Sequence, residues 1–317
     1  MTYRLGIDGG GTKTLGVLIN EKGDVLGRKE TGPSNFLTVG LEEAVINIET
    51  VVYGLCLEHN IVLSDVKLGI GLAGVGREAD KKIMTEALKG RNFNFVLDSD
   101  AYIALMAATE GQDGLAVIAG TGSIAYGLKG KVQARSGGWG YLLGDEGSGY
   151  YIGKRAMFEA CRSYDGRSIP SKLTEVVWDY FACDNQDDFV HLIYEQPPIR
   201  QQVAGLTRKV AELAKKEKDT LAILILKDAA LELALAATTL AKKLGLDKTE
   251  FPLGLIGGVF KAGDYILEPF KEKVLEICPK AKISPCLHEP AIGAVLMLEP
   301  KLDSEVLRKL RSLKNEE

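Results

Sequence analysis

The sequence contains one glycine-rich pattern twice, as Ile7-Asp-Gly-Gly-Gly-Thr-Lys-Thr-Leu-Gly-Val17 and as Ile118-Ala-Gly-Thr-Gly-Ser-Ile-Ala-Tyr-Gly-Leu128. The two copies align at a constant offset of 111 positions, share three glycines, and match the hydroxyl of Thr12 with that of Ser123. Each copy has the pattern of a strand, a tight turn and a returning strand. A repeat that opens two sheets predicts two related domains, and we expect their turns to face a shared cleft.

The composition excludes several classes of protein. A chain of 317 residues with 46% hydrophobic and 26% charged residues is globular rather than disordered and is long enough for about two domains. Its 39 basic and 43 acidic residues give a net charge of −4 with no basic arm, which argues against nucleic acid as the main partner. We read the charged stretch 208–218 as the solvated face of a helix.

The most apolar long stretch, 221–240, contains Lys227, Asp228 and Glu232, so we expect a buried amphipathic helix and no membrane span. The five cysteines form no CxxC pair, and no secretory signal precedes the first strand. These features predict a cytoplasmic protein without disulfides. The three histidines lie far apart in the sequence and give no zinc-binding spacing.

Hydrophobic periodicity predicts two successive α/β regions, of which the first opens with an antiparallel meander. The expected strands are 3–8, 15–19, 25–29, 67–72, 93–97, 115–119, 125–128, 132–135, 252–256 and 281–284. The expected helices are 41–58, 78–88, 101–109, 290–298 and 304–313, with helices also dominating from residue 149 to the strand at 252. We expect an N-terminal domain of residues 1–114 plus 290–317 and a C-terminal domain of residues 115–289.

The two glycine turns are candidate phosphate-binding sites. Successive amides in a glycine-rich turn form a concave anion site, to which Thr12, Thr14, Thr121 and Ser123 would add hydroxyls and Lys13 a positive charge. The chain lacks both the G-x-x-x-x-G-K-[ST] motif and a G-x-G-x-x-G between strand and helix, which argues against P-loop and dinucleotide-binding folds. The alternative is that these glycines only form hairpin turns.

Two carboxylates end strands beside these turns. Asp8 could hold Mg²⁺ directly or through water, or it could cap the amides of its own turn. Asp100 could be a general base toward a substrate hydroxyl, or simply a helix N-cap. Asp98 is a neighbouring carboxylate that could be a second metal ligand or structural.

The loop 137–148 combines several glycines with Trp139, Asp145 and Glu146. An aromatic face and acceptor carboxylates suit a polyhydroxylated ring, whereas the alternative is an ordered loop whose Trp139 fills a core. The pair Gly257-Gly258 ends a late strand before a helix at 259–260, where adenine or ribose could lie against the backbone.

Together these motifs resemble the BadF/BadG/BcrA/BcrD ATPase family, and within it the N-acetylglucosamine kinase branch. The resemblance rests on Asp8-Gly-Gly-Gly-Thr-Lys13, Ala119-Gly-Thr-Gly-Ser123, Gly137-Gly-Trp-Gly140 with Gly144-Asp-Glu-Gly147, Gly257-Gly258 and Pro290-Ala-Ile-Gly-Ala294. It implies an α/β protein with two ribonuclease-H-like domains of the actin/hexokinase/Hsp70 fold around a nucleotide cleft.

The resemblance also implies roles for individual residues. Asp100 would be the catalytic base and Asp8 the metal-binding residue. The nucleotide site would comprise Gly10, Gly11, Thr12, Lys13, Gly120, Thr121, Gly122, Ser123, Gly257 and Gly258. The sugar pocket would comprise Asn35, Gly74, Asp100, Thr121, Gly138, Trp139, Gly140 and Asp145. Phe36 directly follows Asn35, where some relatives carry His and Trp, so the acetamide or lactyl part of the pocket differs here.

The implied activity is transfer of the γ-phosphate of ATP, with Mg²⁺, to the 6-hydroxyl of N-acetylglucosamine, N-acetylmuramic acid or both, and glucosamine is an alternative acceptor. A homodimer is common among such kinases. Other members of this family activate radical dehydratases through a shared iron–sulfur cluster, but Cys161 and Cys183 are widely separated and lack a glycine-flanked loop. A non-catalytic actin-like or chaperone-like ATPase would have no need of the Trp139 loop.

Overall fold

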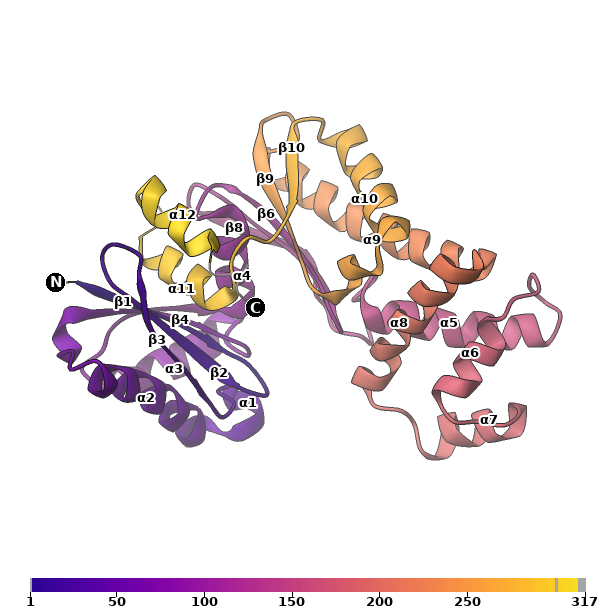
Figure 1. Ribbon diagram of the computed structural model, residues 1–317, viewed down its shortest axis with the longest axis horizontal. Coiled ribbons are helices and arrows are strands. Elements are labelled where there is room, and N and C mark those ends of the chain that lie inside the picture. The colour runs from indigo at the N-terminus through magenta and orange to yellow at the C-terminus, as the bar shows by residue number, and fades with distance from the viewer. Residues whose placement is uncertain (1, 300–301, 313–317) are drawn as a thin grey trace. The chain divides into compact units, whose positions relative to one another are not determined.

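The computed structural model describes residues 2–299 and 302–312 and divides the chain into two compact units (Figure 1). The first unit contains the chain up to Gly114 and from Pro285 onward, and the second runs from Leu115 to Ser284. The chain therefore returns to the first unit at 285 and not at the expected 290. The reason is that His288 and Glu289 already contact residues of the first unit.

The sheet of the first unit has the order β3-β2-β1-β4-β5. Its strands are β1 (Tyr3–Gly9), β2 (Thr14–Ile19), β3 (Val25–Thr31), β4 (Val66–Leu72) and β5 (Asn94–Ser99). The first three strands form the expected antiparallel meander, and β4 and β5 run parallel to β1. The carboxyl ends of β1, β4 and β5 consequently lie at one edge of the sheet, where α/β sheets bind ligands.

The second sheet repeats this order as β8-β7-β6-β9-β10. Its strands are β6 (Gly114–Ala119), β7 (Ser123–Lys129), β8 (Val132–Gly137), β9 (Phe251–Ile256) and β10 (Ala281–Pro285). Strand β6 is parallel to β9, as β1 is to β4, and β7 is antiparallel to β8, as β2 is to β3. The duplication predicted from the two glycine patterns is confirmed at the level of topology.

Helices cover both sheets. Those of the first unit are α1 (Phe36–Val39), α2 (Leu41–Glu58), η1 (Leu63–Asp65), α3 (Glu78–Lys89), α4 (Asp100–Thr109), α11 (Pro290–Leu298) and α12 (Ser304–Ser312). Those of the second are α5 (Gly149–Tyr164), α6 (Leu173–Tyr180), α7 (Gln186–Glu195), α8 (Arg200–Glu217), α9 (Thr220–Leu244), η2 (Gly258–Ala262) and α10 (Asp264–Ile277).

Helix α11 packs so closely on the first sheet that main-chain atoms of the helix and the strands are in contact. A Cβ at Gly6 of β1 would stand 1.9 Å from the Ala291 oxygen, and a Cβ at Gly69 of β4 would stand 1.9 Å from the Ala294 oxygen. On another side of α11, a Cβ at Gly293 would stand 1.9 Å from the Ile103 oxygen of α4. Glycine at these positions lets α11 hold β1 and α4 together through main-chain contact.

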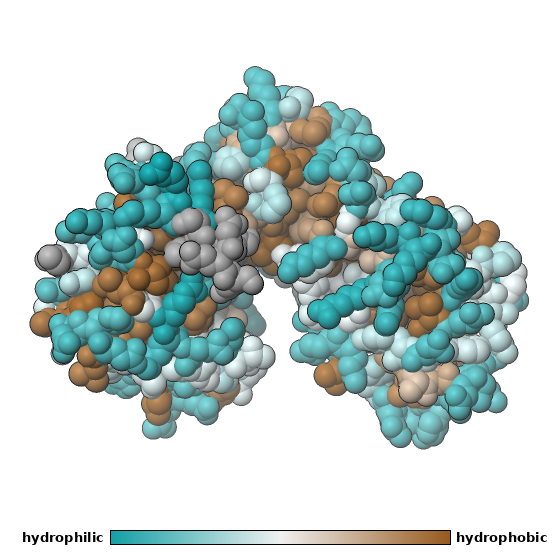
Figure 2. Space-filling view, in the orientation of Figure 1, coloured by the Kyte–Doolittle hydropathy of each residue, from teal (hydrophilic) through white to brown (hydrophobic). Residues whose placement is uncertain are grey.

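Helix α9 is the buried amphipathic helix expected at 221–240. Asp219 caps its start and Gly245, with φ +64°, ends it. Its inner face consists largely of alanine and leucine within the core of the second unit. Among the described residues, no helix is both long and apolar enough to span a membrane. On the face shown in Figure 2, hydrophilic residues predominate and hydrophobic residues form scattered patches.

The chain departs from the expected elements near Gly258. The predicted helix at 259–260 is the short 3₁₀ helix η2, because Gly263, with φ +94°, separates it from α10. The short elements α1 and η1 were not expected. Leu313, the last residue of the predicted closing helix, lies outside the described residues.

A buried ionic cluster joins the two segments by which the chain leaves and re-enters the first unit. Glu110 follows α4 just before the exit, and His288 follows the return. Glu110 Oε1 lies 3.0 Å from His288 Nε2, and the carboxylate also pairs with the guanidinium of Arg311 on α12. Both Glu110 and His288 are buried, so this ionic cluster fixes the two segments to each other.

Candidate active site

The first glycine hairpin is fixed by its own backbone and by the segment after β3. Gly10 N donates to the Lys13 oxygen at 2.9 Å, while the Gly10 oxygen accepts from Ser34 N and Asn35 N. A Cβ at Gly11 would meet no atom within 4 Å, so the turn leaves open space above its amides. Thr14 is fully buried and hydrogen-bonds Ser34, so the expectation that its hydroxyl serves a ligand is wrong.

Asp8 stands at this hairpin among other charges. Burial, followed by repulsion from Asp100 and Glu289, raises the pKa of Asp8 to about 6, while Lys13 opposes the rise. Three carboxylates therefore lie near one another at the ligand-binding edge of the first sheet. A cation bound there would relieve their repulsion, and the oxygen donors suit Mg²⁺. Gly10, the first turn amide, donates to Lys13, so it is not capped by Asp8.

Asp100 is the first residue of α4 but does not cap it. The cap is Ser99, whose Oγ accepts from Tyr102 N at 3.2 Å, so the N-cap alternative for Asp100 is wrong. Asp100 Oδ1 accepts from the local amide of Ala101 at 2.8 Å. Although its surface is open to solvent, surrounding protein raises the pKa of Asp100 by desolvation, and backbone hydrogen bonds partly oppose this.

Asp98 has a structural role. Its Oδ2 lies 2.8 Å from Lys81 Nζ on α3, and its Oδ1 accepts from Ser99 N at 2.7 Å. These contacts fix the turn between β5 and α4 and thereby the start of the helix that carries Asp100. They favour the structural alternative for Asp98 over a second metal ligand.

Asn35 and Gly74 meet beside the first hairpin. Gly74 has φ +90°, and a Cβ there would stand 2.4 Å from Asn35 Oδ1. Asn35 caps α1 through the same oxygen, and Ala73 N donates to the Gly9 oxygen at 2.8 Å. Two predicted sugar-binding residues are thus adjacent to the end of β1.

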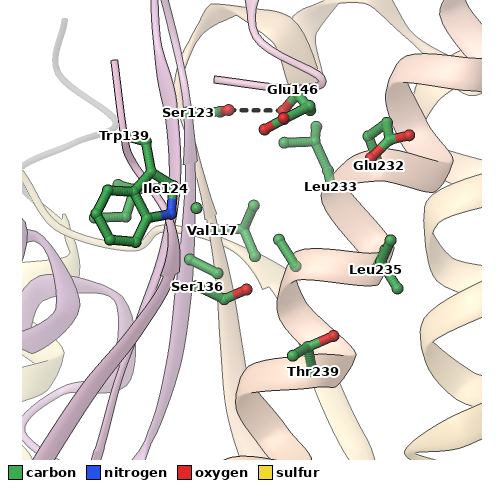
Figure 3. Close-up of a pocket in the computed structure, with 13 residues that line it drawn as sticks. Val117, Ser123, Ile124, Ser136, Trp139, Glu146, Glu232, Leu233, Leu235 and Thr239 are labelled. Atoms are coloured by element: carbon green, nitrogen blue, oxygen red, sulfur yellow. Dashed lines mark hydrogen bonds between the residues drawn. The ribbon is translucent and has the colours of Figure 1, made fainter. Parts of the chain in front are cut away.

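The second glycine hairpin is tied to the Trp139 loop, residues 137–148. Gly149 N donates to the Gly120 oxygen at 2.8 Å, and Ser123 Oγ donates to the Glu146 oxygen at 2.7 Å (Figure 3). Gly257, with φ +108°, lies against the same hairpin, because a Cβ there would stand 2.3 Å from the Ala119 oxygen. Residues predicted to bind phosphate, sugar and adenosine are therefore neighbours in the second unit.

Trp139 lies at the surface, where its side chain is 64% exposed, so the alternative that it fills a core is wrong. Gly137, Gly138 and Gly140 all have positive φ, which brings the loop around the indole. Arg135 holds this turn: its Nη1 donates to the Gly138 oxygen at 2.7 Å, and its guanidinium lies 4.6 Å from the indole centroid.

A cavity of about 350 Å³ opens next to this loop (Figure 3). Side chains of α9, among them Glu232, Leu235 and Thr239, face strands that carry Val117 and Ser136. Repulsion from Asp228 and Glu146 adds to burial in raising the pKa of Glu232.

Asp145 is buried and carries an ion pair that sequence reasoning missed. Its Oδ2 lies 2.6 Å from Nη2 of Arg200, the first residue of α8. No motif surrounds Arg200, and 55 positions separate it from Asp145, so no local signal could have identified the contact.

A second cavity, of about 790 Å³, lies between α8, η2 and α10. Gly258 lines it together with Arg208, Lys218, Lys261 and Tyr265. The charged residues of the stretch 208–218 are all exposed, as expected for a solvated helix face, and some of them also line this cavity. Cationic and aromatic groups around one cavity suit a phosphorylated aromatic ligand such as a nucleotide.

The structure thus gathers the predicted residues into two groups. The first unit brings together Asp8, residues 10–13, Asn35, Gly74 and Asp100. The second brings together residues 120–123, residues 138–140, Asp145, Gly257 and Gly258. Within the described residues, no group of three or more His, Cys, Asp or Glu side chains has the arrangement of a metal site, so Asp8 would hold an ion largely through water.

Comparison with known proteins gives consistent matches along the chain. The model of the BadF/BadG/BcrA/BcrD ATPase family matches residues 5–297. An N-acetylmuramic acid/N-acetylglucosamine kinase of Clostridium acetobutylicum is 34% identical over 96% of this chain and 100% of its own length. An N-acetyl-D-glucosamine kinase of Dictyostelium discoideum is 35% identical over 92% of this chain and 96% of its own. The chain is also similar to a solved structure described as a putative N-acetylglucosamine kinase from Chromobacterium violaceum. The TM-score is 0.72 with 28% identity, and the match covers 94% of this chain and 99% of that one.

Proposed function

Because the chain belongs to the BadF/BadG/BcrA/BcrD ATPase family, we propose that it is an ATP-dependent amino-sugar kinase. The acceptor is the 6-hydroxyl of N-acetylglucosamine, N-acetylmuramic acid or both, in keeping with the two relatives that match nearly the whole chain. The observation that carries the proposal is the position of Asp100. Its carboxylate starts a helix that Ser99 already caps, beside a glycine hairpin and a second carboxylate, Asp8.

In the proposed reaction Asp100 accepts a hydrogen bond from the sugar hydroxyl and takes its proton as the phosphoryl group is transferred. The amides of residues 11–13 and 121–123 bind the phosphates and stabilise their charge, while the amides of Gly10 and Gly120 close the two turns. Asp8 would hold Mg²⁺, which when bound neutralises charge on the phosphates. Little covalent chemistry falls to the protein, so the rate depends on positioning and electrostatics.

In the second unit the Trp139 loop and Asp145 are the proposed sugar contacts, and in the first unit Asn35 and Gly74 are. The exposed indole offers a flat apolar face to the C–H side of a pyranose, and Asp145 accepts hydrogen bonds from its hydroxyls. We propose that the cavity lined by Gly258 and Tyr265 takes the adenosine. The two units would be the two domains of the kinase.

An ADP-release assay over hexoses, hexosamines and N-acetylated hexosamines tests the function. We expect release with N-acetylglucosamine, N-acetylmuramic acid or both, and NMR of the product should place the phosphate on O6. The panel includes glucosamine to test the alternative acceptor. Absence of sugar-dependent ADP release across the panel would refute the proposal.

We also propose a cytoplasmic homodimer. The five cysteines, which all lie in the described part of the chain, form no disulfide, and this is typical of a reducing compartment. Leu224, Leu231 and Leu235 project from α9 as an exposed apolar stripe, a surface that a second copy could cover. Light scattering should give twice the 34.3 kDa of one chain, and Leu231→Glu should reduce this value toward one chain.

A further inference from the structure

We propose that Arg200 is a positioning residue that neutralises Asp145 and thereby allows the second glycine hairpin to accept phosphate. The inference rests on the proposed function for the identity of the ligands. Arg200 lies outside every motif of the sequence and contacts both the predicted sugar-binding loop and the predicted nucleotide-binding hairpin.

The first observation is the isolation of the Asp145 carboxylate from solvent. Its side chain is 5% exposed, and Nη2 of Arg200 lies 2.6 Å from Oδ2. Asp145 also has φ +61°, a left-handed conformation that a non-glycine residue adopts at some cost. A buried carboxylate held in such a backbone requires a cation, because removing one partner of a buried ion pair leaves an uncompensated charge.

The second observation is the contact of both groups with the hairpin. A Cβ at Gly122 would stand 2.4 Å from Arg200 Nη2 and 2.6 Å from Asp145 Oδ2. The guanidinium and the carboxylate therefore share the space directly above the backbone of this turn. Glycine at 122 is what allows the pair to approach so closely.

The third observation is that the loop and the hairpin cannot move independently. The hydrogen bonds from Gly149 N to the Gly120 oxygen and from Ser123 Oγ to the Glu146 oxygen join the hairpin to the chain just after Asp145. Arg200 also lies over the ring of Tyr141, 5.3 Å from its centroid. One guanidinium thus contacts the loop at two points and the hairpin at a third.

These contacts have an electrostatic consequence. A carboxylate at Gly122 without its cation would repel any phosphate on the amides of residues 120–123, since both groups are negative and lie within a few ångströms. With Arg200 in place the pair is neutral, and the amides can act on the phosphate without opposition. Arg200 therefore supports nucleotide binding through Asp145, while Asp145 itself serves the sugar.

Calorimetric titration with ADP and with N-acetylglucosamine tests this role in the full chain. Arg200→Gln should weaken ADP binding at least about tenfold, the effect of one unfavourable charge contact worth about 1.4 kcal/mol. The double variant Arg200→Gln/Asp145→Asn removes the unpaired buried charge and should return ADP affinity to within about threefold of wild type. Its affinity for N-acetylglucosamine should stay below that of wild type, because the Asp145 carboxylate is missing. Arg200→Lys keeps the charge and should rescue ADP binding in part.

Arg167→Gln is the matched control, since it breaks an Arg–Asp pair on the surface of the same unit, with Asp165. It should bind both ligands as wild type does. Wild-type ADP affinity in Arg200→Gln, or a double variant as weak as Arg200→Gln, would overturn the proposal. If Arg200→Gln does not fold, the comparison of Arg200→Lys, Asp145→Asn and the double variant carries the same test.

The ADP titration measures nucleotide binding, so its result does not depend on whether the protein phosphorylates a sugar. A protein that phosphorylates no sugar would refute the proposed function, but a rescue of ADP binding by Asp145→Asn would still support the role of Arg200.

Discussion

The buried cluster of Glu110, His288 and Arg311 should make stability depend on pH through a single imidazole. Burial lowers the pKa of His288 from its ordinary value of 6.5, although Glu110 favours the charged form. The neutral ring donates from Nε2 to Glu110. Charging the buried ring costs desolvation that Glu110 and the backbone of Leu310 only partly offset, so the folded protein resists binding a second ring proton.

The magnitude follows from linkage between proton binding and folding. Above pH 6.5 the imidazole is neutral in both states and contributes nothing to the pH dependence. Below pH 6.5 the unfolded chain binds a proton that the folded chain refuses, so stability falls by up to about 1.4 kcal/mol per pH unit. If His288 stays neutral throughout, the loss between pH 7.5 and 5.0 is about 2 kcal/mol. The low pKa of Glu110 keeps that carboxylate charged across this range.

Chemical denaturation of wild type and His288→Gln at several pH values between 7.5 and 5.0 measures this effect. Glutamine retains a donor toward Glu110 but does not titrate. The unfolding free energy of wild type minus that of His288→Gln should therefore fall by about 2 kcal/mol between pH 7.5 and 5.0. Other titrating groups cancel in that difference. His191→Gln, on the exposed side of α7, should keep the wild-type slope. Identical slopes for wild type and His288→Gln would refute the reasoning.

Three further predictions concern the site. Asp100→Asn should lower turnover by at least about a hundredfold with ADP affinity retained, whereas Asp98→Asn should lower stability but keep turnover. A steady-state assay measures turnover and denaturation curves measure stability. A fully active Asp100→Asn variant would rule out Asp100 as the base. In its proposed role Asp8 would bind Mg²⁺ as the ionised carboxylate, and its pKa is about 6. The Mg²⁺ concentration for half-maximal rate should then rise roughly tenfold per pH unit below that value, and a constant requirement down to pH 5 would contradict this role. Gly257→Ala places a Cβ against the Ala119 oxygen in a backbone with φ +108°, so it should cost about 1–3 kcal/mol of stability and weaken ADP binding. Gly258→Ala is the control: its Cβ would have open space around it, and the denaturation midpoint should stay unchanged.

Local patterns sufficed for much of the fold. Alternation of apolar residues and the two glycine turns predicted every strand within a few residues, and the repeat anticipated the shared sheet order. The family resemblance is confirmed by the match over residues 5–297. The roles assigned to individual site residues stay predictions, although the structure groups them as two clusters.

Contacts across long separations could not be predicted. Thr14 looks like a ligand-binding hydroxyl next to a glycine turn, yet it lies on the inward side of β2 and bonds Ser34. Ser99 and Asp100 are both good caps, and only the backbone decides between them. Arg200 and Asp145 meet only because α8 packs beside the Trp139 loop, which is a property of the tertiary structure and not of any motif.

The three glycine contacts of α11 bear on how this protein could be redesigned. Helix α11 touches β1, which carries Asp8, and α4, which carries Asp100, through main-chain atoms at Gly6 and Gly293. The spacing of the two backbone segments that carry these carboxylates consequently depends on main-chain contact with α11. Libraries aimed at new acceptors can diversify the rim around Trp139, whereas any residue larger than glycine at these buried positions would shift the backbone that carries Asp8 relative to the backbone that carries Asp100.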